Sequence, residues 1–360
     1  MAKIDQLFRE MKESGASDLH LSVGFPPILR LKGKMVRTEH PVLTNDSLTE
    51  WLYEILTPQQ REELENNRDL DSAYEIPDVA RFRCNFFYQH RGIAAVFRII
   101  PTKILTISDL NLPEVLYKIA GFRRGVVVVT GPTGSGKSTT LAAIIDHVNK
   151  TRAAHILTIE DPIEFVHPNI KCLITQREAG LHAHSFSDAL RVATREDPDI
   201  ILVGEMRDLE TISLALTCAS LGILVFGTLH TNSAAKTIDR IIDAFPSDQQ
   251  NQVRSMLGDS VQAIIAQQLL RTKDGKGRCA ANEILLGSSA LANIIREGKV
   301  TQIPSLIQAG ITEGMQTMDG ALMKLVKEDR ITAEAAYEKA IDKSLFAGMI
   351  SGKDRLLEEA

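Results

Sequence analysis

The chain has 360 residues and 44% hydrophobic content, so it can bury a substantial core, and its length predicts two or three structural units. Lys and Arg number 41 against 46 Asp and Glu, a formal net charge of −5 that gives no overall basic field favouring nucleic acid as the main partner. The N-terminus lacks an apolar signal core and the longest apolar runs are too short to span a membrane, so we expect a cytoplasmic protein without direct membrane insertion. Four scattered cysteines without a CxxC pair favour reduced, mostly buried thiols over a zinc site or a disulfide framework.

Residues 1–105 predict a domain of α+β type. An apolar stripe at helical spacing over residues 4–11 comes first, and a polar helical stretch follows over Leu48–Asn67. Two alternating runs predict a hairpin with its turn near Gly92, and Pro101 closes the unit. The predicted strands of this domain are Leu19–Leu21, Ile28–Leu31, Arg81–Tyr88 and Ile93–Ile99.

Residues 106–360 predict a second domain of α/β type. From Gly125 onward, short apolar runs alternate with helix-compatible segments, which is typical of a parallel sheet covered by helices. After Ser247 helical periodicity dominates, through residues such as Val253, Leu257 and Ile264, so we expect a helical C-terminal part over about 247–360. The predicted core strands are Val126–Thr130, His155–Glu160, Ile200–Gly204 and Leu224–Leu229.

A phosphate-binding loop follows the first of these core strands. Residues 131–138 match the pattern GxxxxGK[ST] at every fixed position, between a β-branched run and a helical one. We expect main-chain N–H groups to surround the β-phosphate of ATP, Lys137 to contact the β- and γ-oxygens, and Ser138 to hold Mg²⁺. The predicted nucleotide-binding residues are Gly131, Pro132, Thr133, Gly134, Ser135, Gly136, Lys137, Ser138 and Thr139.

Polar residues at the ends of other core strands are candidates for catalysis, because ligands of an open parallel sheet lie beyond the carboxyl ends of its strands. Glu205 follows the strand that is most like a Walker B strand, so we expect it to orient or deprotonate the attacking water, directly or through Mg²⁺. Glu160 and Glu164 are candidates to position metal or water, and His230 is a candidate sensor of the γ-phosphate.

Each of these candidates also has a structural interpretation. Glu205 fits an acidic helix cap, and the two other glutamates flank Asp161-Pro162, which is an ordinary turn signal. A single histidine at a strand end, such as His230, is more often structural than catalytic.

Seven motifs, distributed over nearly the whole chain, give it a family resemblance. The chain resembles the type IV pilus retraction (twitching motility) ATPases, the PilT-like branch of the type II/IV secretion ATPase superfamily. The motifs are ASDLHLSVGFPPILRLKG, RFRCNFFYQHRG, VFRIIP, GPTGSGKST, TIEDPIEFVH, REDPDIILVGEMRD and GTLHTNSAAKTIDRIIDAFP.

The resemblance implies a PAS-like N-terminal domain and a RecA-like ATPase domain that assemble as a ring-shaped homohexamer, with ATP between the two domains. It also implies that Arg83 and Arg98 reach the nucleotide phosphates, where a guanidinium spreads its charge over several oxygens. Without the resemblance, both arginines fit hairpin residues paired to surface acids. The implied partners are an inner-membrane pilus platform protein, at the membrane base of the pilus machine, and a paralogous pilus ATPase.

The sequence differs from the family pattern at three places. Residues 219–223 read ASLGI where relatives usually carry an acid and a histidine, Ala292 replaces an arginine, and Thr194 replaces an apolar residue. Because of these changes, a catalytically weak accessory subunit is an alternative interpretation to a retraction motor. A second alternative is a pilus assembly or type II secretion ATPase, although the chain shows neither the further N-terminal domain nor the four-cysteine zinc insert common in those relatives.

Overall fold

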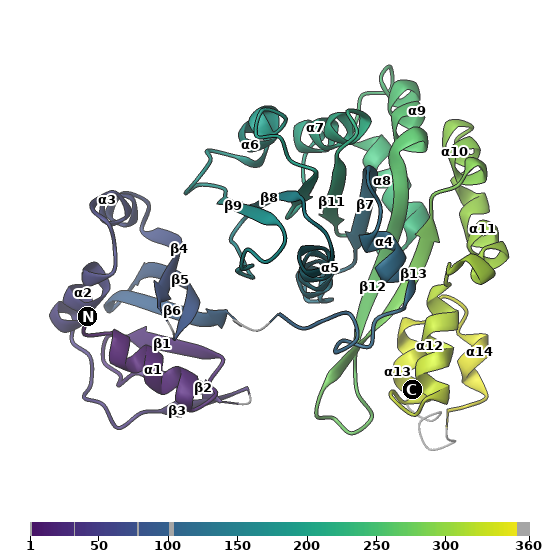
Figure 1. Cartoon of the computed structure of the whole chain (residues 1–360). Coiled ribbons are helices and arrows are strands. Elements are labelled where there is room, and N and C mark those ends of the chain that lie inside the picture. The colour runs from purple at the N-terminus through teal and green to yellow at the C-terminus, as the bar shows by residue number, and fades with distance from the viewer. Residues whose placement is uncertain (1, 32, 78, 101–103, 351–360) are drawn as a thin grey trace. The chain divides into compact units, whose positions relative to one another are not determined.

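The computed structural model describes residues 2–31, 33–77, 79–100 and 104–350, and it divides the chain into two compact units, Met1–Lys103 and Ile104–Ala360. Figure 1 shows one sheet in each unit, with helices packed around it. Pro101, which is expected to close the first unit, lies outside the described residues.

In its described residues, the first unit has a six-stranded antiparallel sheet in the order β3-β2-β1-β6-β5-β4, with three helices. The α+β expectation is confirmed. Aromatic side chains fill its core: Phe8 stacks on Phe82 with ring centroids 4.3 Å apart and meets Phe97 edge-on at 4.9 Å. The elements are α1 Asp5–Glu13, β1 Asp18–Ser22, β2 Ile28–Leu31, β3 Lys34–Arg37, α2 Asn45–Glu54, α3 Pro58–Asn67, β4 Asp69–Ile76, β5 Ala80–Gln89 and β6 Gly92–Ile100.

The polar stretch Leu48–Asn67 forms two helices where the sequence predicts one. Thr57 accepts a hydrogen bond from the Gln60 main chain through its side chain, and Pro58 occupies the first turn. A capping threonine followed by proline starts a new helix, because proline lacks the N–H that a continuing helix needs.

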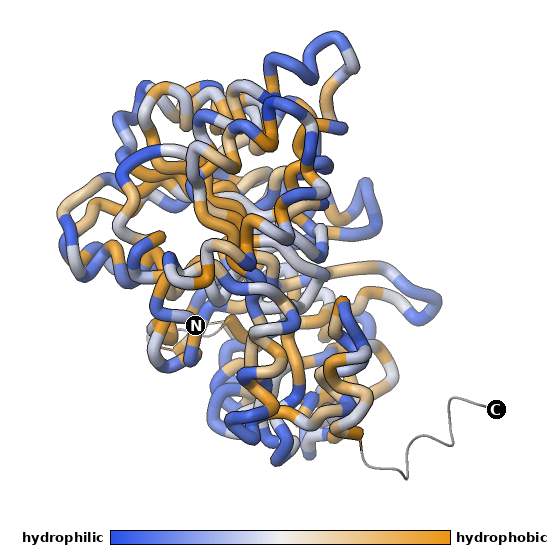
Figure 2. The backbone as a smooth tube through the Cα atoms, turned by 90° about the vertical axis from the view of Figure 1, so that its right-hand side faces the viewer, coloured by the Kyte–Doolittle hydropathy of each residue, from blue (hydrophilic) through white to orange (hydrophobic). Residues whose placement is uncertain are grey.

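The second unit contains a seven-stranded sheet in the order β13-β12-β7-β11-β10-β8-β9, and its strand pairs are parallel except β12 with β13. The parallel α/β core is confirmed, and Figure 2 shows apolar segments in the interior with hydrophilic segments on the outer loops. The strands are β7 Gly125–Thr130, β8 His155–Glu160, β9 Leu173–Glu178, β10 Ile200–Val203, β11 Leu224–Leu229, β12 Val261–Arg271 and β13 Arg278–Leu286.

Helices cover this sheet and form the C-terminal part of the chain. Those around the sheet are α4 Val115–Ala120, α5 Lys137–Thr151, α6 Phe186–Ala193, α7 Leu209–Ser220, α8 Ala234–Asp243 and α9 Gln250–Ser260. The C-terminal ones are α10 Ser289–Arg296, α11 Ile303–Ala309, α12 Met318–Lys327, α13 Ala333–Lys339 and α14 Ser344–Ala347, with 3₁₀ turns at Val300–Gln302 and Ile311–Glu313. Within the described part of the chain, no helix has both the length and the apolar character to cross a membrane.

The expectation of helix beyond Ser260 is wrong for the segment up to Leu286. Strand β12 pairs in parallel with β7 and in antiparallel with β13, so this hairpin extends the central sheet. The apolar run from Val261 is buried on both faces, and such a run has no periodicity that separates a buried helix from a buried strand. The long-range pairing with β7 decides the outcome.

Candidate functional site

The phosphate loop begins where β7 ends and becomes the first turn of α5. Gly136 caps this helix with φ of 85°, and Gly131 has φ of 149°. A Cβ on Gly131 would lie 2.3 Å from the Gln267 carbonyl oxygen, so only glycine fits there. The first turn of a helix has N–H groups without intrahelical partners, and this makes the start of α5 a suitable seat for phosphate.

Lys137 folds back over the loop. Its Nζ donates to the Gly131 carbonyl (2.8 Å) and to the Pro132 carbonyl (3.2 Å). Burial lowers the pKa of Lys137, while the negative charges of Glu205 and Glu164 oppose this effect. The ammonium therefore lies within the field of both carboxylates, and phosphate oxygens are natural replacements for the two carbonyls that it contacts.

Glu205 follows β10 and lies between two basic side chains. Its Oε2 is 2.7 Å from Arg207 Nη2, and its Oε1 is 2.8 Å from His230 Nε2. Burial on its own would raise the pKa of Glu205, but hydrogen bonds and charge from Arg207 and His230 outweigh burial and lower it. The carboxylate therefore stays ionised, as a proton acceptor must.

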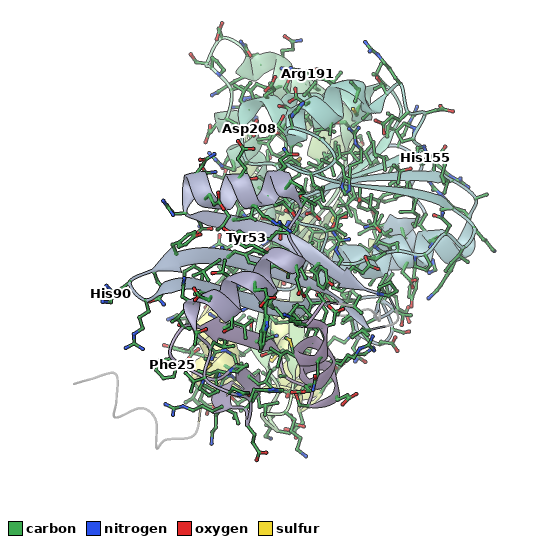
Figure 3. All side chains as sticks on the ribbon, turned by 90° about the vertical axis from the view of Figure 1, so that its left-hand side faces the viewer. Phe25, Tyr53, His90, His155, Arg191 and Asp208 are labelled. Atoms are coloured by element: carbon green, nitrogen blue, oxygen red, sulfur yellow. The ribbon has the colours of Figure 1, made fainter. Side chains whose placement is uncertain are left out.

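Main-chain bonds hold the neighbouring strand ends together around Glu205. Gly204 N donates to Ile159 O (2.8 Å), and Met206 N donates to Thr228 O (3.0 Å). Asp208 then caps α7 by accepting from Thr211 N (2.8 Å), which ends the loop; Figure 3 labels this aspartate. The loop that carries Glu205 is thus attached to the strands on both sides of β10.

Glu160 and Glu164 have different surroundings. The Thr158 hydroxyl (2.7 Å) and the Gln176 amide (3.1 Å) donate to Glu160 Oε1. Burial raises the pKa of Glu160, and the main-chain N–H of Glu164 also donates to its carboxylate. Glu164 itself is exposed, and its negative charge acts to raise the pKa of Lys137. Glu160 therefore holds its own loop, whereas Glu164 is available to a ligand at the phosphate loop.

A chain of threonine hydroxyls links the end of β7 to α8. Thr130 Oγ1 donates to Thr231 O (2.8 Å) and accepts from Thr231 N (2.9 Å), and the hydroxyl of Thr231 lies 2.6 Å from that of Thr237. These contacts fix the segment after β11, which carries His230, beside the strand that leads into the phosphate loop.

Gln267 is a residue of this site that the sequence does not reveal. It lies on β12, is 2% exposed, and its Nε2 donates to the Ser135 carbonyl of the phosphate loop (2.6 Å). The segment around Gln267 carries no motif. Because the sequence predicts helix there, Gln267 is not expected on a strand next to the phosphate loop. Recognising β12 as the strand next to β7 is the step that would have identified it.

Arg83 and Arg98 lie directly opposite each other on β5 and β6 of the first unit. Arg98 Nε donates to Asp18 Oδ1 (2.8 Å), and Arg83 Nη2 lies 3.5 Å from Asp71 Oδ2. Asp18 is buried, while at least half of each arginine side chain is exposed. The hairpin thus presents two exposed guanidinium groups side by side, each beside an acid.

One departure from the family pattern, residues 219–223, lies at the opposite end of β11 from His230. Leu221 is 67% exposed in the turn before β11, whereas His230 follows the other end of that strand. Six strand residues separate the two ends, a span of about 20 Å. Ala292 is buried on α10, where its main chain lies against Gly258 of α9.

Comparison with known proteins gives consistent matches. The model of the family described as "Type II/IV secretion system protein" matches residues 2–302. The type IV pilus retraction ATPase PilT of Pseudomonas aeruginosa is 54% identical over 94% of this chain and 98% of that protein. A twitching motility protein of Neisseria gonorrhoeae is 53% identical over 87% of this chain and 84% of that protein. The type IV pilus ATPase PilU of P. aeruginosa is 40% identical over 94% and 88% of the two chains.

A solved structure is similar over the same extent. The crystal structure of the pilus retraction motor PilT with bound ADP superposes with a TM-score of 0.90 and 45% sequence identity, covering 96% of this chain and 99% of that chain.

Proposed function

The chain belongs to the type II/IV secretion system protein family, and we propose that it is a motor that hydrolyses ATP to drive type IV pilus retraction and twitching motility. The observation that carries this function is the meeting of the phosphate loop with Glu205 and His230 at one edge of the parallel sheet. The relatives that carry retraction and twitching in their names match over almost the whole chain, so the motor function comes with the nucleotide site.

The residues divide the work of hydrolysis. The main-chain N–H groups of residues 133–139 and the Lys137 ammonium bind the β- and γ-phosphates, because both are hydrogen-bond donors that the fold holds in place with positive potential toward the ligand. Glu205 is held ionised and accepts the proton of the attacking water. His230 hydrogen-bonds to Glu205 and reports the state of the γ-phosphate, and Glu164 orients water near Lys137.

The site suits Mg²⁺. Hard oxygen donors are what this ion prefers, and the Ser138 hydroxyl at the start of α5 and the ionised Glu205 after β10 supply them. When bound there, the ion would neutralise part of the negative charge of the phosphates.

The arginine pair provides the link to movement. In a homohexameric ring, Arg83 and Arg98 contact the nucleotide phosphates, and loss of phosphate releases these contacts. The acids that hold these arginines in the present structure, Asp71 and Asp18, receive them again after release.

The motor works in the cytoplasm at the inner-membrane base of the pilus machine. Its domain rotations act on an inner-membrane platform protein and depolymerise the fibre. A paralogous pilus ATPase is a natural companion, since a pilus ATPase of this kind exists: the relative named PilU is 40% identical over 94% of this chain.

Complementation of a deletion strain tests this function. We expect cells that carry Lys137→Ala to be hyperpiliated and immobile, because fibres are still assembled but not withdrawn. Wild-type complementation should restore twitching. Bald cells would instead identify an assembly motor, and wild-type phosphate release no faster than that of Lys137→Ala would identify a catalytically weak accessory subunit.

A further inference from the structure

Gln267 lies beside the phosphate loop, and both the nitrogen and the oxygen of its side-chain amide make hydrogen bonds. Its Nε2 donates to Ser135 O (2.6 Å), and its Oε1 accepts from Thr140 Oγ1 (2.8 Å) and Asn282 Nδ2 (2.9 Å). Ser135 belongs to the loop, Thr140 to the first turns of α5, and Asn282 to β13. One buried amide therefore joins the loop, its helix and the edge hairpin.

The chemistry of these partners fixes the orientation of the amide. A main-chain carbonyl is only an acceptor, so the NH₂ group of Gln267 must face Ser135. Its oxygen then faces Thr140 and Asn282, and this makes Asn282 present its NH₂ group to Gln267. The NH₂ group of Gln267 thus points to the phosphate loop, and the NH₂ group of Asn282 points to Gln267.

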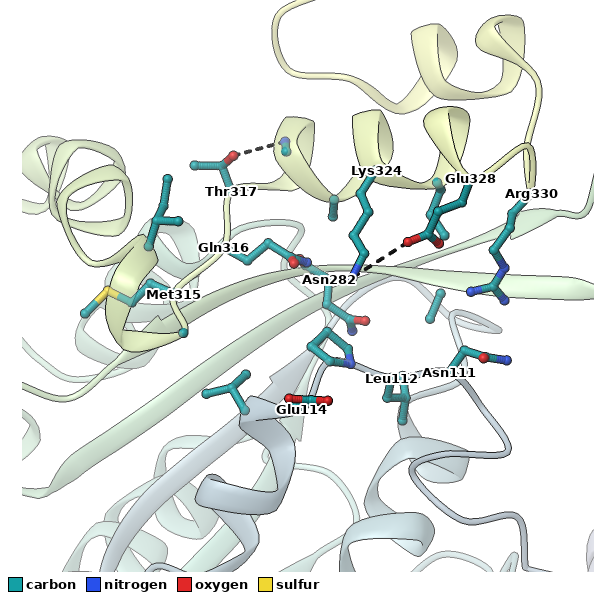
Figure 4. Close-up of a pocket in the computed structure, with 18 residues that line it drawn as sticks. Asn111, Leu112, Glu114, Asn282, Met315, Gln316, Thr317, Lys324, Glu328 and Arg330 are labelled. Atoms are coloured by element: carbon teal, nitrogen blue, oxygen red, sulfur yellow. Dashed lines mark hydrogen bonds and ion pairs between the residues drawn. The ribbon is translucent and has the colours of Figure 1, made fainter.

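Asn282, which hydrogen-bonds to Gln267, also lines a pocket. Its Oδ1 has no hydrogen-bond partner among the described residues, and its main-chain carbonyl accepts from Gln316 Nε2 (2.7 Å). Figure 4 shows Asn282 and Gln316 in the wall of a pocket of about 560 Å³, which α12 covers on one side.

The loop also fits closely against Gln267. A Cβ on Gly136 would lie 3.0 Å from Gln267 Nε2, and one on Gly131 would lie 2.3 Å from its carbonyl oxygen. Two glycines of the phosphate-binding pattern are therefore required partly by this neighbour. The phosphate loop therefore packs closely against Gln267 at both glycines.

We propose that Gln267 is a positioning residue for nucleotide binding, which holds the phosphate loop in its binding shape through Ser135 and Thr140, with Asn282 orienting its amide. The inference rests on the proposed ATPase function. Because the loop binds the phosphates in the ground state and in the transition state alike, loosening it weakens nucleotide binding more than it slows the chemical step.

Gln267→Met tests this role, with Gln268→Met as its matched control. Methionine keeps the length of the side chain and removes its hydrogen bonds. Gln268 is the next residue of the same strand and faces away from the loop, toward Lys339 O (3.5 Å). The full-length variants are titrated with ADP by calorimetry, and KM and kcat for ATP are measured by phosphate release.

We expect Gln267→Met to weaken ADP binding about tenfold and to raise KM by a similar factor, with kcat within about twofold of the wild type. Gln268→Met should retain wild-type binding. Weaker ADP binding by folded Gln267→Met alone supports the proposal. Unchanged ADP binding by this variant overturns it, and so does an equal loss of ADP affinity in Gln268→Met.

Asn282→Leu keeps the inference testable if Gln267→Met does not fold. It leaves Gln267 in place but removes the donor that orients its oxygen. ADP binding should therefore weaken by a smaller factor than in Gln267→Met, with a correspondingly smaller rise in KM and an unchanged kcat. Unchanged KM would overturn the role of Asn282, and a fall in kcat alone would overturn a binding role. Failure of the wild type to bind ADP would instead remove the proposed function itself.

Discussion

His230, which follows β11, lies 2.8 Å from the carboxylate of Glu205, which follows β10. The contact joins the ends of two neighbouring parallel strands at the edge where the phosphate loop also lies. Thr231, the residue after His230, hydrogen-bonds to Thr130 of β7 and to Thr237 of α8, which fixes the segment that carries His230 beside the strand that leads into the phosphate loop. The pair is therefore suited to hold an ionised carboxylate at this edge.

Glu205→Gln should retain nucleotide binding and lose hydrolysis. The amide keeps the shape of the side chain but does not accept a proton, so we expect phosphate release to fall about 10²-fold or more. Calorimetry with a non-hydrolysable ATP analogue and magnesium checks binding in the same preparation. Comparable phosphate release by the variant would exclude Glu205 as the proton acceptor.

The pH dependence of turnover should reflect the two bases around Glu205. Its pKa is lowered in the folded protein, so activity is lost only as pH falls below the ordinary range of a glutamate. His230→Ala removes one hydrogen-bond donor to Glu205, which should raise the pKa of Glu205 and move the acidic limb of kcat/KM to higher pH. The same lowered pKa adds stability above the ordinary glutamate range, and this stability is lost as pH falls through the folded-state value. An acidic limb that does not move would separate His230 from Glu205.

Glu164→Gln and Glu160→Gln should have different effects. Glu164 is exposed and its negative charge acts on Lys137 of the phosphate loop. Loss of this charge should therefore reduce turnover by about tenfold or more. Glu160 is already bound by Thr158 and Gln176, so its amide variant should mainly lower thermal stability. Phosphate release and thermal midpoints of both variants check this division, which an equal loss of turnover would contradict.

Replacing Arg83 and Arg98 together by Ala should cut turnover by at least about tenfold, because the phosphates lose two positive groups. Arg9→Ala is a matched control, since Arg9 is exposed on α1 of the same unit. Circular dichroism confirms folding, and steady-state phosphate release gives the result. Turnover equal to that of the control would return both arginines to a purely structural role.

Phe8→Ala should destabilise the first unit by about 3–5 kcal/mol, since Phe8 is fully buried and packs against Phe82 and Phe97. The measurement is denaturant unfolding followed by circular dichroism. Phe25→Ala is the control, because Phe25 is only half-buried and its loss leaves no core cavity. Equal losses of stability in the two variants would show that the aromatic cluster does not dominate the core.

Features with a contiguous signal could be predicted from the sequence. The phosphate loop has its full pattern in eight neighbouring residues, and strands such as β8 and β11 are β-branched or apolar runs bounded by polar residues. The placement of Glu205 and His230 at one edge also follows, because the carboxyl ends of parallel strands meet there.

Only the tertiary structure decided how long-range partners share the site. It made Val261–Leu286 a hairpin of the central sheet, because pairing with β7 outweighed a local pattern that fits helix equally well. It distinguished the roles of Glu160 and Glu164, because Thr158 and Gln176 donate hydrogen bonds to Glu160. It brought Gln267 to Ser135 across 132 positions of sequence, a contact that no local pattern encodes, since its energy depends on two segments that meet only in the folded sheet.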